Sequence, residues 1–81
     1  MGQLLGEIRL FPYNFVPAGW APCEGQLRVI TQEQALFAVL GKRYGGDGQS
    51  NFALPNLKGK APDPNMRYCI AMQGEFPSAR A

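Results

Sequence analysis

The stretch that decides the fold is ITQEQALFAVLGKR, residues 30–43. Thr31, with Gln34 three residues later, fits a capping box, in which two side chains satisfy the free N–H groups at a helix start. Apolar residues then recur with helical period as far as Leu40, and a glycine follows where helices commonly end. The pattern predicts one short helix over about residues 32–40.

Strand patterns lie on both sides of this helix. Polar and apolar residues alternate over residues 6–11 and, most clearly, over residues 66–73, as they do in half-buried strands. Residues 26–30 predict another short strand, and residues 51–57 predict a short extended piece. Short strands around a single helix indicate a small α+β fold with antiparallel strands.

The remaining segments predict loops and turns. Ten glycines and seven prolines in 81 residues favour a turn-rich chain. Residues 13–25 predict a long ordered loop, because their large aromatic side chains can anchor it. Residues 44–48 predict a tight turn and residues 58–65 a polar turn. From Pro77 onward, small residues predict a frayed tail.

Length and hydropathy restrict the class of protein. A chain of 81 residues can build one modest core, so we expect a single domain over residues 1–81. It contains no run of about 18 apolar residues, so we expect no membrane insertion. Its N-terminus has no basic region of the kind that a signal peptide carries, so we expect synthesis in a bacterial cytoplasm.

The charged and reactive residues argue against catalysis. The net charge is only +2 and the basic residues are scattered, which argues against nucleic-acid binding. Histidine, the commonest general base and metal ligand, is absent. Cys23 and Cys69 therefore lack a histidine base that would form a thiolate. A disulfide between these two cysteines is one alternative, but buried free thiols are favoured. The sequence predicts no catalytic residue, no metal site and no cofactor.

The glycine-rich segment around Asp47 is compared with two ligand-binding loops. A phosphate-binding loop needs Gly-Lys followed by Ser or Thr, and neither Gly-Lys pair of this chain meets that requirement. A calcium loop that starts at Asp47 needs Glu at its twelfth position, where the chain has Lys58. A plain turn is therefore favoured.

An ordered series of short stretches resembles the phage tail-collar family. The stretches are LGEIRLF (5–11), PAGWAPCEGQ (17–26), YGGDG (44–48) and FALPNL (52–57). The C-terminal stretches YCIA (68–71) and GEFPS (74–78) look like the ending of the bacterial branch called microcystin-dependent proteins. The resemblance covers about residues 5–78, which we take as the core of the domain. Single stretches are weak signals, but their order is specific.

The resemblance implies a structural role in assembly without catalysis. Family members are tail-fibre or baseplate components, and their collar domain is a small α+β unit that sits with two further copies around a three-fold axis. Relatives usually carry a long insertion before the final strand, with a His-x-His pattern that can bind metal. Here only three residues separate Pro62 from Met66. Metal binding and direct receptor binding are therefore not carried over.

Aromatic residues, 11% of the chain, make up most of the candidate contacts. We expect a minimal collar module of a phage tail or tail-like particle that forms a trimer or docks on other tail or baseplate proteins. Burial between copies would stabilise its thin core. The alternative is a small module that binds a carbohydrate or a host protein through an aromatic patch. The candidate contact residues are Phe11, Tyr13, Phe15, Trp20, Arg43, Tyr44 and Phe52.

Overall fold

The computed structural model describes residues 3–77, and within them the chain forms five short antiparallel strands, one 3₁₀ turn and one short α-helix. This confirms the predicted α+β class. Residues 78–81 of the expected tail, with residue 78 at the expected end of the core, lie outside the described residues. The elements are β1 (Ile8–Pro12), β2 (Trp20–Pro22), β3 (Leu27–Val29), η1 (Ile30–Gln32), α1 (Gln34–Leu40), β4 (Asn51–Ala53) and β5 (Met66–Ala71).

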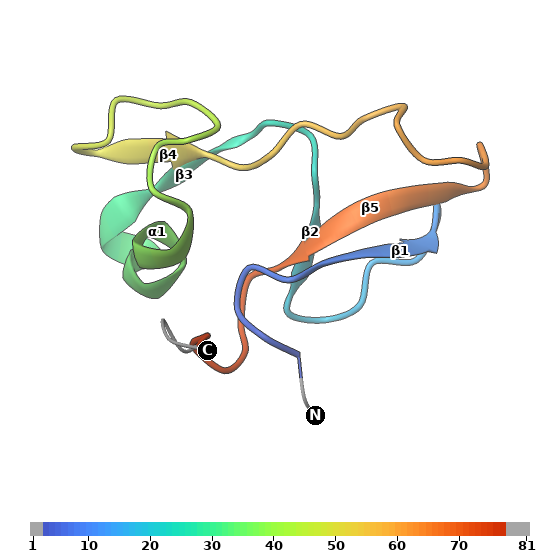
Figure 1. Cartoon of the computed structure of the whole chain (residues 1–81), viewed down its shortest axis with the longest axis horizontal. Coiled ribbons are helices and arrows are strands. Elements are labelled where there is room, and N and C mark those ends of the chain that lie inside the picture. Colours follow the sequence, from blue (N-terminus) through green and yellow to red (C-terminus); the bar gives the residue numbers. More distant parts are fainter. Residues whose placement is uncertain (1–2, 78–81) are drawn as a thin grey trace.

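The larger sheet has three strands in the order β1-β5-β2, and both pairings are antiparallel (Figure 1). The register places Phe11 opposite Arg67 and Ala21 opposite Ile70. β2 lies inside the segment that the sequence predicts as loop, so that prediction is wrong for these three residues. Pro22 is compatible with a strand here because β2 is an edge strand, and the backbone groups on its outer edge have no strand to pair with.

The central strand β5 is buried differently from the prediction. Alternation over residues 66–73 predicts one buried face, but Cys69, Ile70 and Ala71 are all fully buried. A strand between two others can be covered on both faces, and its residues are then apolar or small without alternation. Only the first half of β5, from Met66 to Tyr68, keeps partial exposure.

The helix begins later than predicted. Thr31 belongs to η1, and α1 begins at Gln34 with Glu33 as N-cap and no side-chain capping bond, so the predicted capping box is wrong. The Glu33 N–H is instead bonded to the Ile30 carbonyl at 3.0 Å, which makes the entry a 3₁₀ turn. The predicted end is confirmed: Gly41 has φ +61° and donates its N–H to the Phe37 carbonyl at 2.7 Å.

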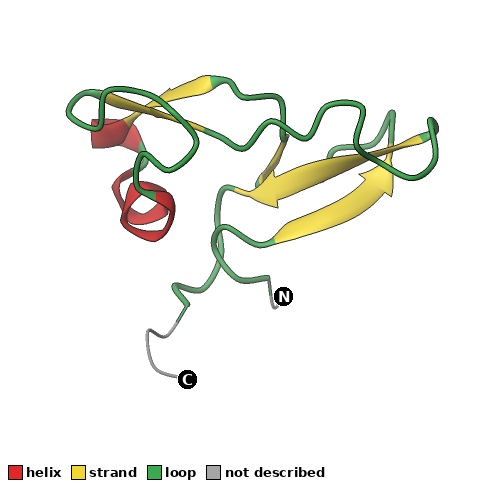
Figure 2. Cartoon of the chain, turned by 45° about the horizontal axis from the view of Figure 1, so that its top comes forward, coloured by secondary structure: helices red, strands yellow, loops and turns green. Residues whose placement is uncertain are grey.

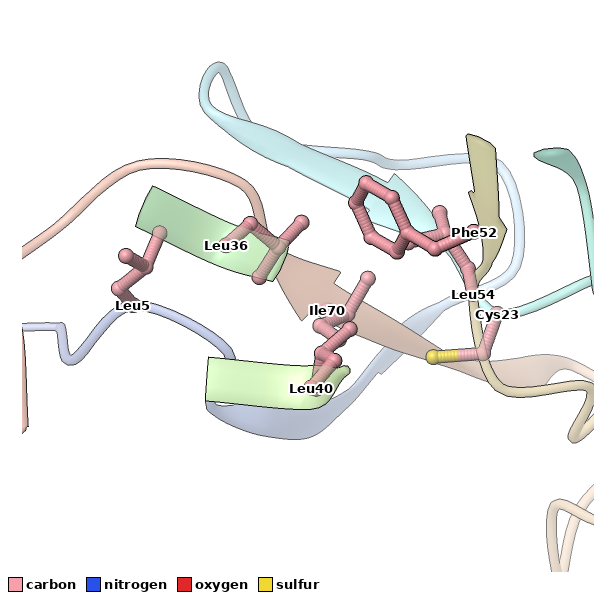
Figure 3. Packing of buried hydrophobic residues seen from close by; sticks show 7 residues of the cluster. All are labelled: Leu5, Cys23, Leu36, Leu40, Phe52, Leu54 and Ile70. Atoms are coloured by element: carbon pink, nitrogen blue, oxygen red, sulfur yellow. The ribbon is translucent and has the colours of Figure 1, made fainter. Parts of the chain in front are cut away.

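The smaller sheet pairs β3 with β4 and lies with α1 at one end of the molecule, while the three-stranded sheet lies at the other (Figures 1 and 2). The core connects these parts. Its buried residues come from the N-terminal segment, the helix and both sheets, and their side chains converge in Figure 3. They are Leu5, Cys23, Leu36, Leu40, Phe52, Leu54 and Ile70.

The turn before β4 is held by one carboxylate. Asp47 Oδ1 accepts the N–H groups of Gln49, Ser50 and Asn51 at 2.8–3.1 Å. These bonds hold the pKa of Asp47 well below its usual range. Gly46, with φ +89°, lies so close to β4 that a Cβ would stand 2.5 Å from the Phe52 Cα. The predicted plain turn is confirmed, with a carboxylate whose acceptor sites are used inside the turn.

Candidate functional site

Three aromatic rings from β1, β2 and the loop between them form a continuous row, here called the aromatic row: Phe11, Phe15 and Trp20. Phe11 meets Trp20 edge to face with 4.9 Å between ring centroids, and meets Phe15 in the same way at 6.3 Å. Phe15 remains 56% exposed. The row therefore ends in a large apolar side chain that faces solvent, which is typical of a contact surface.

One arginine contacts the aromatic row, and a second contacts Tyr13, which follows β1. The Arg9 guanidinium lies 5.5 Å from the centre of the Trp20 ring, and the Arg67 guanidinium lies 4.6 Å from that of Tyr13. Both distances fit cation–π contacts. The sequence analysis did not select either arginine. For Arg67 the reason is that only the pairing of β1 with β5 brings it beside Phe11 and the residues that follow β1.

Arg67 also borders a groove of about 430 Å³. The turn before β5 forms part of its lining, which also includes Tyr13, Glu24, Leu57 and Lys58. Glu24 is 3.4 Å from an Arg67 nitrogen, a loose ion pair, and the buried Arg67 Nε has no partner among the described residues. The groove thus offers aromatic surface beside charged side chains.

The other candidate contact residues do not join the aromatic row. Arg43 and Tyr44 are exposed and follow α1 in the loop before β4, at the opposite end of the molecule from the β1–β2 loop (Figure 1). Phe52 has no exposed surface and packs against Phe37 with 5.4 Å between ring centroids. Phe52 is therefore a core residue, and its assignment as a contact is corrected for that reason.

The reactive groups are placed unfavourably for chemistry. Cys23 and Cys69 are free and buried, as favoured from the sequence. Burial, with a smaller effect of the neighbouring Cys69, raises the pKa of the Cys23 thiol to about 12. Burial also raises the pKa of Cys69. Both thiols are thus held in the protonated form, which is a poor nucleophile.

Residues 3–77 also lack two kinds of feature. No group of three or more Cys, Asp and Glu side chains in this part of the chain is placed to hold a metal ion. Neither of its helices has the length and apolar character needed to cross a membrane.

Comparison with known proteins gives the family. The family model described as Phage Tail Collar Domain matches residues 6–62. The search of the curated proteins and the search of the solved structures found no match. The matched residues run from just before β1 into the turn that precedes β5 and make up more than half of the chain. The chain therefore belongs to the phage tail collar domain family, whose domains are structural modules of phage tails and tail fibres.

Proposed function

We propose that this chain is a minimal collar module that works by self-association, as a trimer, and by docking on other tail or baseplate proteins. It acts in a virion or a phage tail-like particle and performs no catalysis. The observation that carries the proposal is the aromatic row, which leaves Phe15 exposed and carries Arg9 on its Trp20 ring. Aromatic and arginine side chains are the residue types that dominate binding energy at protein interfaces.

The small size of the domain supports burial between copies. A chain of 81 residues buries only about 60–65% of the surface that it exposes when unfolded. Association adds stability to such a chain through mass action. The C-terminal resemblance over residues 68–71 supports the microcystin-dependent branch of the family.

We further propose that residues 1–81 fold as one domain without the insertion that relatives carry. Two backbone bonds support this: Lys60 donates to the Leu57 carbonyl at 3.0 Å, and Met66 donates to the Asp63 carbonyl at 2.9 Å. Consecutive turns thus lead the chain directly into β5. Cooperative thermal unfolding of the 81-residue chain is the expected result, and a gradual, non-cooperative loss of structure would contradict it.

Light scattering coupled to size exclusion tests the trimer. The chain should elute at three times its 8.9 kDa mass. Phe15→Ser should reduce the mass to that of the monomer. The matched control is Phe76→Ser, because Phe76 is also about half exposed but lies outside the aromatic row. A monomer at high concentration, or equal behaviour of the two variants, would remove the basis for the proposal.

One observation favours the second candidate, a carbohydrate- or host-protein-binding module. The groove beside Tyr13 combines aromatic surface with the charged side chains of Glu24 and Arg67. Sugar rings stack on aromatic faces and hydrogen-bond to such groups. Titration with purified bacterial surface polysaccharide, followed by chemical shifts of Tyr13 and Arg67, would support this function if both residues shift. Unchanged shifts would exclude the polysaccharide as a ligand.

A further inference from the structure

The strand β3 has the opposite polarity from a strand that packs on a core. Leu27 and Val29 are 60% and 47% exposed, whereas Arg28 between them is only partly exposed, on the other face, and is ion-paired with Glu33 at 2.6 Å. Side chains alternate between the two faces of a strand, so the two apolar residues share the face that is open to solvent. An apolar outer face on a two-stranded sheet, which is itself marginal in water, calls for an explanation.

The backbone of β3 is also open on one edge. The Leu54 N–H is bonded to the Gln26 carbonyl at 3.0 Å, and the Ile30 N–H is bonded to the Ser50 carbonyl at 3.1 Å. Backbone groups alternate in direction along an antiparallel strand, so residues 26, 28 and 30 face β4. The N–H groups of Leu27 and Val29, and the Leu27 carbonyl, therefore point away from β4. Among the described residues, none of these three groups has a backbone partner.

The other strand edges carry features that block pairing. The free edge of β4 is covered by the preceding turn, since the Ala53 N–H is bonded to the Gly45 carbonyl at 3.1 Å. Pro22 in β2 and Pro12 in β1 have no N–H to offer. Covering loops and edge prolines are the usual means by which proteins prevent strand addition. The open edge of β3 has neither a covering loop nor a proline.

We propose that the open edge of β3 pairs with β3 of a second copy of this chain, antiparallel and centred on Arg28. In this register Val29 of each copy donates its N–H to the Leu27 carbonyl of the other copy. The backbone pattern is thus self-complementary across a two-fold axis, as an isologous contact requires. The two copies of Leu27 and Val29 then form one apolar cluster on the outer face of a four-stranded sheet.

Charge is compatible with this pairing. The register places the two Arg28 residues opposite each other, and like charges in that position destabilise a sheet. Here each guanidinium is already paired with Glu33 of its own chain, whose carboxylate neutralises it at 2.6 Å. The edge is only three residues long, so the buried area is well below the roughly 1,000 Å² of a stable interface. The pairing should therefore be weak in solution and effective where copies are held close together.

Nuclear magnetic resonance of the full 81-residue chain tests the pairing. From micromolar to millimolar concentration, hydrogen exchange of the Val29 amide should slow by about tenfold or more. In a sample that mixes labelled and unlabelled chains, Leu27 methyl groups of one copy should show contacts to Val29 methyl groups of the other. Exchange that stays fast at millimolar concentration, protection already present at micromolar concentration, or intermolecular contacts only elsewhere would each overturn the proposal.

Two variants separate pairing from folding. Val29→Pro removes one outward N–H, and the φ of −84° at this residue is close to the about −65° that proline requires. It should keep the thermal midpoint within a few degrees and abolish the concentration dependence. Val29→Thr retains the N–H and the branched shape, so it should keep the dependence in weakened form. Pairing that persists in Val29→Pro would refute the register.

A third variant covers the case in which the proline variant fails to fold. Val29→Lys places a charge on the outer face without changing the backbone, and it should abolish pairing in a folded chain. Because the aromatic row belongs to the other sheet, neither Val29→Pro nor Val29→Lys should change the trimer mass at micromolar concentration. Loss of the trimer in a variant that remains folded would contradict the assignment of two separate contacts.

Discussion

Substitution of Gly46 by alanine tests how tightly the turn before β4 is packed. Gly59→Ala is the matched control, because both glycines are exposed and have similar φ angles, +89° and +77°. A Cβ at Gly46 would lie 2.5 Å from the Phe52 Cα, whereas a Cβ at Gly59 would meet nothing within 4 Å. Both variants incur the strain of a positive φ, but only the first must also displace β4.

The expected losses follow from these two effects. A left-handed residue with a Cβ costs about 1–2 kcal/mol. Insertion of a methyl group against a backbone that cannot yield adds about 1–3 kcal/mol. Gly59→Ala should therefore lose about 1–2 kcal/mol and Gly46→Ala about 2–5 kcal/mol of unfolding free energy. For a domain of this size each kcal/mol lowers Tm by about 4–8 °C.

Urea and thermal unfolding, followed by the fluorescence of Trp20 and by circular dichroism, measure both losses. Trp20 is a suitable reporter because it lies in β2, away from both substitutions in sequence, and packs edge to face on Phe11. Equal destabilisation by the two alanines would show that the close approach of Gly46 to β4 has no energetic consequence. The packing described for this turn would then be refuted.

Four further outcomes follow from buried and charged groups. Phe52→Ala should lose about 3–5 kcal/mol, because a fully buried ring is removed, and urea unfolding should show it as a large fall in midpoint. Because its pKa is lowered in the folded chain, the Asp47 carboxylate stabilises the fold above the unfolded pKa of about 3.9, and this stability is lost as pH falls further. Asp47→Asn should therefore flatten the acid side of the curve of unfolding free energy against pH. Cys23 and Cys69 should resist a thiol reagent at pH 8 until the chain is unfolded. Because burial raises the pKa of Cys23 to about 12, stability should fall as pH rises above the unfolded value of about 8.5, where only the unfolded thiol ionises. A flat acid curve in the parent chain, rapid thiol labelling of the folded chain, or constant stability up to pH 10 would contradict the respective expectation.

Elements that depend on neighbouring residues in the sequence could be predicted from it. Gly41 ends the helix because its φ of +61° suits a residue without a side chain, and such a preference is visible in one sequence. The strand around Cys69 was equally visible as alternation, although its burial on both faces was not. That burial depends on the neighbouring strands, which the pattern of β5 alone does not identify.

Other features depend on contacts between distant residues. Trp20–Pro22 shows no strand pattern, and its extended form comes from pairing with β5, which lies more than forty residues away in the chain. Which aromatic residues are exposed also depends on contacts between distant segments. Phe52 and Phe15 are both aromatic residues in turn-rich segments, yet one is the centre of the core and the other is exposed. Composition cannot separate them, because burial is decided by which segments the sheets bring together.

The position of β5 has a consequence for synthesis on the ribosome. β1 and β2 do not pair with each other, and the strand that joins them is made after every other strand of the described chain. A nascent chain therefore exposes the inner edges of both strands until residues 66–71 have left the exit tunnel. The three-stranded sheet can form only near the end of translation, so the order of folding is set by the last strand. Any pause before residue 66 would lengthen the time during which these edges are open to pairing between neighbouring nascent chains.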